Sequence, residues 1–130
     1  MKREITTHKI NGLNEALTIA VLDEPGHGNA CHQYAITTPG KPLRAELRHP
    51  TVNCEIQFQN GPIKESGVNG ISIEALLAIV RDRLEGFQQG GPYACVANRI
   101  ALVNVIGAMD ALLVRTLERT ERGVEGTHQK

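Results

Sequence analysis

The N-terminal half of the chain consists of apolar segments separated by turn-forming residues. Residues 16–24 (ALTIAVLDE) are rich in β-branched side chains and end at Pro25-Gly26, which predicts a strand that runs into a turn. Residues 32–38 (HQYAITT) predict its partner strand. In residues 51–59 (TVNCEIQFQ), apolar side chains alternate with polar ones, and this alternation predicts a third strand with one apolar face.

Turn-forming residues lie on both sides of the third predicted strand. Residues 39–50 contain three prolines, so we expect a surface excursion there and not a central strand. Residues 60–70 (NGPIKESGVNG) contain two Asn-Gly steps and a Gly-Pro step, which are typical of turns.

The C-terminal half has helical spacing. Ser72 is a suitable N-cap for a helix whose apolar side chains recur every three or four residues from Ile73 to Phe87. Residues 88–92 (QQGGP) break this helix, and a second one is predicted over about 94–122. At about 1.5 Å per residue, the second helix is on the order of 43 Å long. It is therefore longer than a compact domain of this size, whose diameter is roughly 35 Å.

The long predicted helix has two apolar stripes. The first comprises Leu102, Val105, Met109 and Leu112, and the second comprises Ile100, Val103, Ile106, Leu113 and Leu117. One short helix and a small sheet can cover only one stripe. We therefore predict a helical hairpin whose second stripe packs against another subunit, which makes the protein a homo-oligomer. The alternative is a bent or shorter helix, which Gly107 would favour.

The composition narrows the class of protein. A length of 130 residues predicts a single domain, and 14 basic side chains balance 14 acidic ones. The chain thus lacks the overall field that drives sequence-independent binding of nucleic acid, and we expect no DNA or RNA partner. The N-terminus is too polar for a signal peptide, and no run approaches the length of about 18 apolar residues that spans a membrane. We therefore expect a cytoplasmic protein with no membrane partner. The three cysteines form no CxxC spacing, which fits a reducing compartment.

Positive charge gathers in the segment RTLERTERGVEGTH, residues 115–128. A helix carries Arg115, Arg119 and Arg122 on one face. Cations near a helix C-terminus complement the helix dipole, so a purely structural role is one interpretation. Three arginines in place of lysines favour the other interpretation, which is bidentate binding of phosphate. Gly123 would then allow backbone N–H groups to approach the ligand.

Two rings and an amide lie near the break between the predicted helices. Phe87 and Tyr93 could stack on a nucleobase or could close the end of the hairpin core, and Tyr93 is the freer of the two. Asn98 could bind a polar edge of a ligand, although capping of the neighbouring backbone is the default interpretation.

Metal-binding and catalytic patterns are weaker. A site built from His27, His32 and Cys54 is the one metal-binding combination left open. No GxSxG, HExxH or P-loop spacing occurs, and no carboxylate pair has a recognisable catalytic context. We interpret Asp23 and Glu24 as turn residues beside Pro25.

Four strings in the chain resemble the successive motifs of a phage family, the Thoeris anti-defence proteins of the first type. They are VLDEPGHGNACHQY, FQNGPIKESGVNG, LLAIVRDRLEGFQ and RTLERTERGVEGTH. The resemblance covers most of the chain from about Leu17 onward, and the second and fourth strings are long and specific.

The resemblance implies a protein that binds a signal and does not turn it over. Thoeris immunity makes a cyclic ADP-ribose isomer as an alarm signal, and the family binds that molecule tightly and leaves it intact. The family fold is a small antiparallel sheet with two C-terminal helices, assembled as dimers or hexamers. Some members also hold cyclic oligonucleotides at a separate site. Carried over by residue, the resemblance makes Phe87 a base-stacking platform, Asn98 a polar contact, and Arg115 and Arg119 the phosphate-binding arginines.

The chain departs from the family pattern at three places. Val96-Ala97-Asn98 stands where the family commonly has Arg-Glu-Asn, which removes one polar contact. Residues 103–113 are less charged than in the family, which implies an altered subunit interface. The loop at 89–92 is one residue longer.

Together these features predict an α+β protein. A small antiparallel sheet occupies about residues 16–60, a two-helix hairpin with one long helix occupies about 72–122, and a tail occupies 123–130. Two subunits are expected to build each pocket. The predicted ligand-binding residues are Phe87, Tyr93, Asn98, Arg115, Arg119, Arg122, Gly123 and Val124. No catalytic residue, cofactor or metal is expected.

The predicted function is sequestration of a cyclic ADP-ribose isomer, of the glycocyclic ADP-ribose type, in the cytoplasm of the infected bacterial host. A homodimer and a hexamer made of three dimers are both compatible with this function. Three alternatives stay open. They are a sponge mainly for the cyclic oligonucleotides of CBASS immunity, an enzyme that cleaves a cyclic nucleotide with Glu125 or His128 as base, and a purely structural protein.

Overall fold

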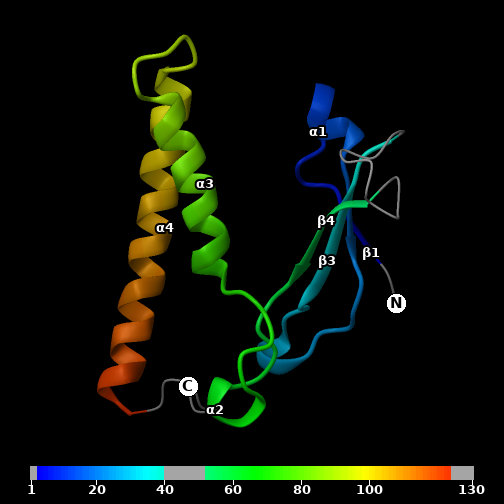
Figure 1. Cartoon of the computed structure of the whole chain (residues 1–130), viewed down its shortest axis with the longest axis vertical. Helices are drawn as coiled ribbons and strands as arrows, with labels where there is room; N and C mark the ends of the chain where they lie inside the picture. The colour runs from blue at the N-terminus through cyan, green and yellow to red at the C-terminus, as the bar shows by residue number, and fades with distance from the viewer. Residues whose placement is uncertain (1–2, 40–51, 124–130) are drawn as a thin grey trace. The chain divides into compact units, whose positions relative to one another are not determined.

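The computed structural model describes residues 3–39 and 52–123. Contacts within the chain divide it into two compact units, residues 1–60 and 61–130 (Figure 1). The first unit contains the sheet and the second contains the longer helices. The α+β class and the order of sheet before helices are as predicted. A single domain over residues 1–130 stays a prediction, as does the surface excursion at 39–50, which lies almost entirely outside the described residues.

The sheet of the first unit is a four-stranded antiparallel meander in the order β1-β2-β3-β4. Its strands are β1 (Arg3–Ile5), β2 (Thr18–Val21), β3 (Gln33–Thr37) and β4 (Val52–Gln57). The three predicted strands are confirmed, although each is shorter than its apolar segment. The sequence analysis missed β1, whose three residues are too few to show a period. It also missed the short helix α1 (Gly12–Ala16).

The register of the sheet places the buried Val21 in one row with two half-buried side chains. Val21 of β2 lies opposite Tyr34 of β3, and Tyr34 lies opposite Ile56 of β4. Directly opposed residues point to the same face of a sheet, so these three side chains pack as one row. Val21 is fully buried. The ring of Tyr34 meets that of Phe58 edge to face, with centroids 5.7 Å apart.

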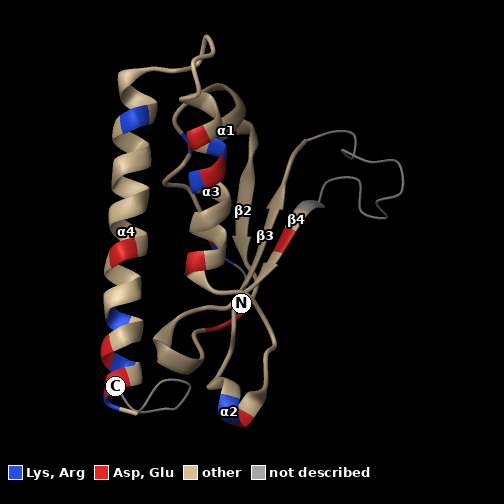
Figure 2. Ribbon diagram, turned by 60° about the vertical axis from the view of Figure 1, so that its left-hand side comes forward, with Lys and Arg blue, Asp and Glu red and all other residues tan. Residues whose placement is uncertain are grey.

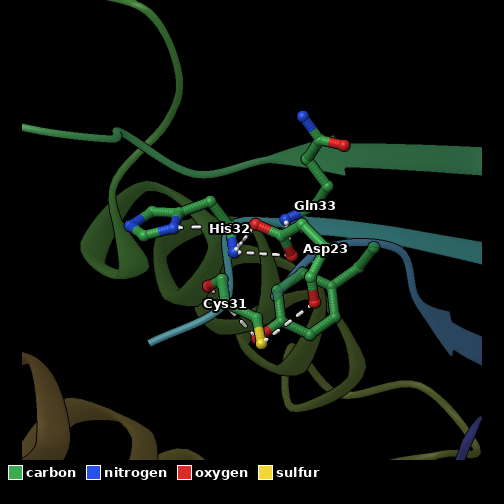
Figure 3. Close-up of polar contacts among 5 residues, drawn as sticks. Asp23, Cys31, His32 and Gln33 are labelled. Carbon is green, nitrogen blue, oxygen red and sulfur yellow. Dashed lines mark hydrogen bonds and ion pairs between the residues drawn. The ribbon is translucent and has the colours of Figure 1, made fainter. Parts of the chain in front are cut away.

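A carboxylate holds the connection between β2 and β3 (Figure 3). The two oxygens of Asp23 accept hydrogen bonds from the main-chain N–H of His32, at 3.1 and 2.9 Å, and Oδ1 also accepts from Gln33 N at 3.1 Å. The His32 side chain is buried, and its Nδ1 lies 3.8 Å from Asp23 Oδ2. The Cys31 thiol donates to the Asp23 carbonyl at 3.5 Å. Asp23 is therefore more than the turn residue that the sequence suggested, because its side chain joins the two ends of the connection.

These contacts set the ionisation of Asp23. Burial by itself raises the pKa of the Asp23 carboxyl, but the N–H donors of His32 and Gln33 and the charge of His32 together outweigh it. The pKa of this carboxyl is therefore lower than its ordinary value.

The second unit consists of three helices, α2 (Ile63–Ser66), α3 (Ile73–Phe87) and α4 (Val96–Glu121). The predicted N-cap is confirmed, because Ser72 Oγ accepts a hydrogen bond from Ala75 N at 3.0 Å. The helices α3 and α4 pack against each other as an antiparallel hairpin (Figure 1). The alternative of a shorter second helix is wrong, since α4 runs without interruption through Gly107. The short α2 falls in a segment that was predicted as turns only.

The two stripes of α4 have different environments. The first stripe is half-buried and comprises Leu102, Val105, Met109 and Leu112. The exposed side carries Val96, Ile100, Val103, Leu113, Val114 and Leu117, which are between 54% and 62% exposed. Within the predicted outer stripe, Ile106 is the member that is half-buried. The pattern thus predicted correctly that one apolar side of the long helix is not covered within the hairpin, while the homo-oligomer itself stays a prediction.

The helix α4 is also apolar enough, by length and composition, to cross a membrane, which is true of no other helix within residues 3–39 and 52–123. This criterion is weak by itself because the core helix of a folded protein also meets it. The apolar window of α4 is not enclosed in the single chain. Apolar surface of α4 is thus exposed in the single chain. The absence of a membrane partner stays a prediction.

We expect Asp23→Asn to lower the melting temperature at neutral pH, because a neutral amide offers one acceptor where the carboxylate offers two. A carboxyl whose pKa is lowered by folding contributes stability above its unfolded-state pKa and loses it as the pH falls through the folded-state pKa. The difference in melting temperature between wild type and variant should therefore shrink below about pH 4. Thermal unfolding followed by circular dichroism from pH 3 to 7 measures this, with the exposed Glu55→Gln as control. Equal melting temperatures at neutral pH would contradict the assigned role of the carboxylate.

Candidate functional site

Two aromatic rings meet at the end of the helical hairpin. Phe87 is the last residue of α3 and is half-buried, while Tyr93 lies in the following loop and is 69% exposed. The ring centroids are 5.9 Å apart and the planes are inclined by 52°. The structure thus brings together the two predicted stacking residues. It places Phe87 at the C-terminal end of the apolar side of α3. At this position one ring can both pack in the hairpin and stack on a ligand.

Three polar contacts hold the loop that carries Tyr93. Gln88 Oε1 accepts a hydrogen bond from Cys95 N at 3.0 Å. Cys95 is the N-cap of α4, and its Sγ accepts from Asn98 N at 3.4 Å. The Asn98 side chain in turn donates from Nδ2 to the Tyr93 carbonyl at 2.9 Å. These contacts link the end of α3, the loop and the first turn of α4.

Asn98 therefore has the capping role that was the default interpretation. Because its Nδ2 is used within the loop, the side-chain oxygen Oδ1 is the atom best suited to accept a hydrogen bond from a ligand. A contact between Asn98 and a ligand stays a prediction. Sequence reasoning missed Gln88 and Cys95, whose roles depend on how the loop closes in space.

The positively charged side chain of Arg83 lies next to one of the two rings. The guanidinium carbon of Arg83 lies 5.0 Å from the centroid of the Phe87 ring, over its face, which is the geometry of a cation–π contact. The signal for this contact was present in the sequence as a spacing of four residues on one helix.

The arginines lie at the C-terminal end of α4. Figure 2 shows that charged residues gather in the last turns of this helix, whereas its middle is almost free of them. Arg115 is exposed and Arg119 is half-buried, and their spacing of one helical turn places them on one face. Arg122 is the C-cap of the helix. Two glutamates, Glu118 and Glu121, share these turns.

The glycine after the helix has a structural role. Gly123 adopts a φ of 72° and donates its N–H to the Thr120 carbonyl at 3.0 Å, so it ends α4 in the usual manner of a left-handed glycine. Its predicted ligand contact stays a prediction. Val124, together with Glu125 and His128 of the enzymatic alternative, lies outside the described residues.

The two groups of predicted site residues lie at opposite ends of α4. Arg115 follows Asn98 by 17 residues, which corresponds to about 26 Å along a helix at about 1.5 Å per residue. This length corresponds to the rise of about eight stacked nucleotides at about 3.4 Å each. One chain therefore cannot place both groups on the same small nucleotide.

The metal-binding combination left open by the sequence is wrong. Among residues 3–39 and 52–123, no three histidine, cysteine, aspartate or glutamate side chains are placed to hold a metal ion. His32 is buried against Asp23, whereas His27 and Cys54 are exposed, so the three do not meet.

Comparison with known proteins gives one informative relative. No protein-family model matches the chain. The chain is 36% identical over 117 residues to a protein of Bacillus phage SBSphiJ7 that is named Thoeris anti-defense 1. The alignment covers 78% of this chain and 82% of that protein. The similarity thus extends over most of both chains and is not confined to one short motif.

We expect Asn98→Ala to loosen the loop between α3 and α4, because it removes the hydrogen bond to the Tyr93 carbonyl. A hydrogen bond of this kind contributes about 1 kcal/mol, so local opening of residues 88–95 should become about fivefold more frequent. Amide hydrogen exchange read by mass spectrometry measures this. Gln89→Ala, which replaces another exposed amide side chain in the same loop, serves as control. Equal exchange in both variants would show that Asn98 does not hold the loop.

Proposed function

Because the chain belongs to the Thoeris anti-defense 1 family of phage proteins, we propose that it captures a cyclic ADP-ribose isomer and holds it intact. Membership gives the protein an anti-defence role in the infected bacterial host. Capture of the alarm signal in the host cytoplasm would keep Thoeris immunity from being activated. The observation that carries the proposal is the distribution of its site residues along α4, with an exposed apolar surface between the two groups.

The exposed side of α4 has a register that suits pairing with a second copy. Its members recur in alternating steps of four and three residues, the spacing by which helices pack side by side. We call this set the outer seam, and it comprises Val96, Ile100, Val103, Gly107, Asp110, Val114 and Leu117. Its centre is Gly107, and no atom lies within 4 Å of a Cβ built there, so a second backbone can approach closely.

Antiparallel pairing about Gly107 brings the outer seams of two copies together. Ile100 then faces Val114 of the second copy, and Val96 comes opposite residue 118, beside Leu117. Asp110, the charged residue of the seam, faces Asn104 of the second copy, whose amide can donate to it. The pairing therefore buries apolar surface without leaving the carboxylate unpaired.

The same pairing completes the ligand site. Asn98 of one copy comes opposite residue 116 of the other, between Arg115 and Arg119. Two such sites form in a dimer, one at each end of the paired helices, and each takes residues from both chains. The two groups of site residues, about 26 Å apart in one chain, thus come close together when each is supplied by a different chain.

Each group has a role suited to one part of the ligand. Phe87 and Tyr93 stack on the adenine, which is worth about 1 to 3 kcal/mol per base. Asn98 Oδ1 accepts from a polar edge. Arg115 and Arg119 bind the pyrophosphate through their guanidinium groups, with Arg122 adding positive charge. Ligand contacts of Gly123 and Val124 stay predictions.

Capture without cleavage follows from what these residues offer. Aromatic rings, an amide and guanidinium groups bind the ground state of a nucleotide well, but none of them is a positioned nucleophile or general base. Such a site provides affinity and no additional stabilisation of a transition state. The proposal therefore includes that the protein is not an enzyme and uses no cofactor.

The direct experiment is isothermal titration with cyclic ADP-ribose isomers, followed by heat denaturation and chromatography of the released ligand. Tight binding and recovery of unchanged ligand support capture. Recovery of a cleaved product would favour the enzymatic alternative. Binding of cyclic oligonucleotides without binding of any cyclic ADP-ribose isomer would redirect the proposal to CBASS signals.

We expect Arg119→Ala to abolish capture while leaving the fold intact, because the pyrophosphate loses a charged partner. Loss of one member of a desolvated charge pair costs about 2 to 5 kcal/mol, which corresponds to an affinity decrease of at least about 30-fold. Arg81→Ala is the control, because Arg81 lies on α3 in an ion pair with Glu85 at 3.4 Å. Unchanged affinity in Arg119→Ala would remove this arginine from the site.

Mixing two inactive variants tests whether each pocket takes residues from two chains. In a mixed dimer of Phe87→Ala and Arg119→Ala chains, one pocket contains both substitutions and the other contains neither. We therefore expect binding to reappear when the two variants are unfolded together and refolded, with one intact site per mixed dimer, which is half of the capacity of a wild-type dimer. If each pocket belonged to a single chain, every pocket would carry one substitution and mixing would restore nothing.

A further inference from the structure

Arg83 stands out among the charged residues of α3. Its guanidinium carbon lies 5.0 Å from the centroid of the Phe87 ring, over its face. This is the end of the hairpin where Tyr93 and Asn98 also lie. Arg81, two residues earlier, has an ordinary surface role, since its Nε pairs with Glu85 at 3.4 Å. Within the described residues, the contact that is observed for Arg83 is with a ring and not with a carboxylate.

The contact constrains the ring from one side. Phe87 is the last residue of α3, so no following helical turn packs against its side chain. The planar guanidinium covers one face of the phenyl group, and Tyr93 lies beside it with its plane inclined by 52°. A planar cation on one face also draws electron density toward itself, which leaves the opposite face better suited to an electron-rich purine.

We propose that Arg83 is a positioning residue that fixes the Phe87 ring and thereby favours a purine base on the opposite face of that ring. The inference rests on the proposed function for its ligand, but the orientation of the ring is a property of the protein alone. Arg83 acts through Phe87 and does not bind the pyrophosphate, which belongs to the arginines at the far end of α4.

The experiment compares Arg83→Met, which keeps the aliphatic stem, Arg83→Lys, which keeps the charge, and the control Arg81→Met. Two probes are titrated, cyclic ADP-ribose and inorganic pyrophosphate. A cation–π contact at an exposed site corresponds to a factor of about two to five in affinity. We expect Arg83→Met to lose this factor for cyclic ADP-ribose, Arg83→Lys to recover part of it, and pyrophosphate binding to be the same in all variants. An equal loss for both probes would overturn the proposal, because Arg83 would then act as a general anion-binding charge.

A ligand-free measurement separates this inference from the proposed function. Phenylalanine ring signals are recorded by NMR, and the Phe87 signal is assigned by its absence in Phe87→Leu. In Arg83→Met the ring signals of Phe87 should shift and its contacts to Tyr93 should weaken, whereas Arg81→Met should leave both unchanged. If wild type binds no cyclic ADP-ribose but this result holds, the proposed function fails and the positioning role stands. Identical spectra for wild type and Arg83→Met would overturn the positioning role, whatever the protein binds.

Discussion

The apolar surface of α4 is the constraint on which the rest of the second unit depends. A helix of 26 residues with apolar side chains on two sides needs cover on both, and α3 supplies only one. No residue of α3 or α4 is fully buried in the single chain. Because apolar surface left in water costs about 25 cal/mol per Å², the outer seam favours association. In the proposed pairing, the hairpin forms half of a larger core.

The proposed function links association and ligand binding through this helix. The outer seam lies between the aromatic end and the arginine end of α4, so the proposed pairing that buries it also assembles both sites. A ligand that bridges two chains binds only the assembled form and stabilises it by mass action. In this pairing, the arginines of each proposed site come from the second copy. The chain as a whole carries no net charge. Selectivity for a small anionic ligand over nucleic acid is consistent with this balance.

Polar contacts fix one connecting segment in each unit in the absence of a ligand. In the first unit, the Asp23 carboxylate binds two main-chain N–H groups and fixes the connection between β2 and β3. In the second, Gln88, Cys95 and Asn98 close the loop that presents Tyr93. Fixing a loop in advance reduces the entropy lost when a ligand binds. The chain thus uses few aromatic residues but holds them in defined positions.

The sequence by itself determined the elements whose signal is local and periodic. The alternation in residues 51–59 predicted β4, the spacing after Ser72 predicted α3 and its cap, and the two stripes predicted that one side of α4 is not covered by α3. Only the tertiary structure decided the role of Asp23, the capping contact of Asn98 and the position of Arg83 over Phe87. It also separated the predicted site residues into two groups at opposite ends of one helix. The physical reason is that periodicity reports which face of an element is apolar, whereas hydrogen bonds and ring contacts depend on how loops close and which residues then come within reach.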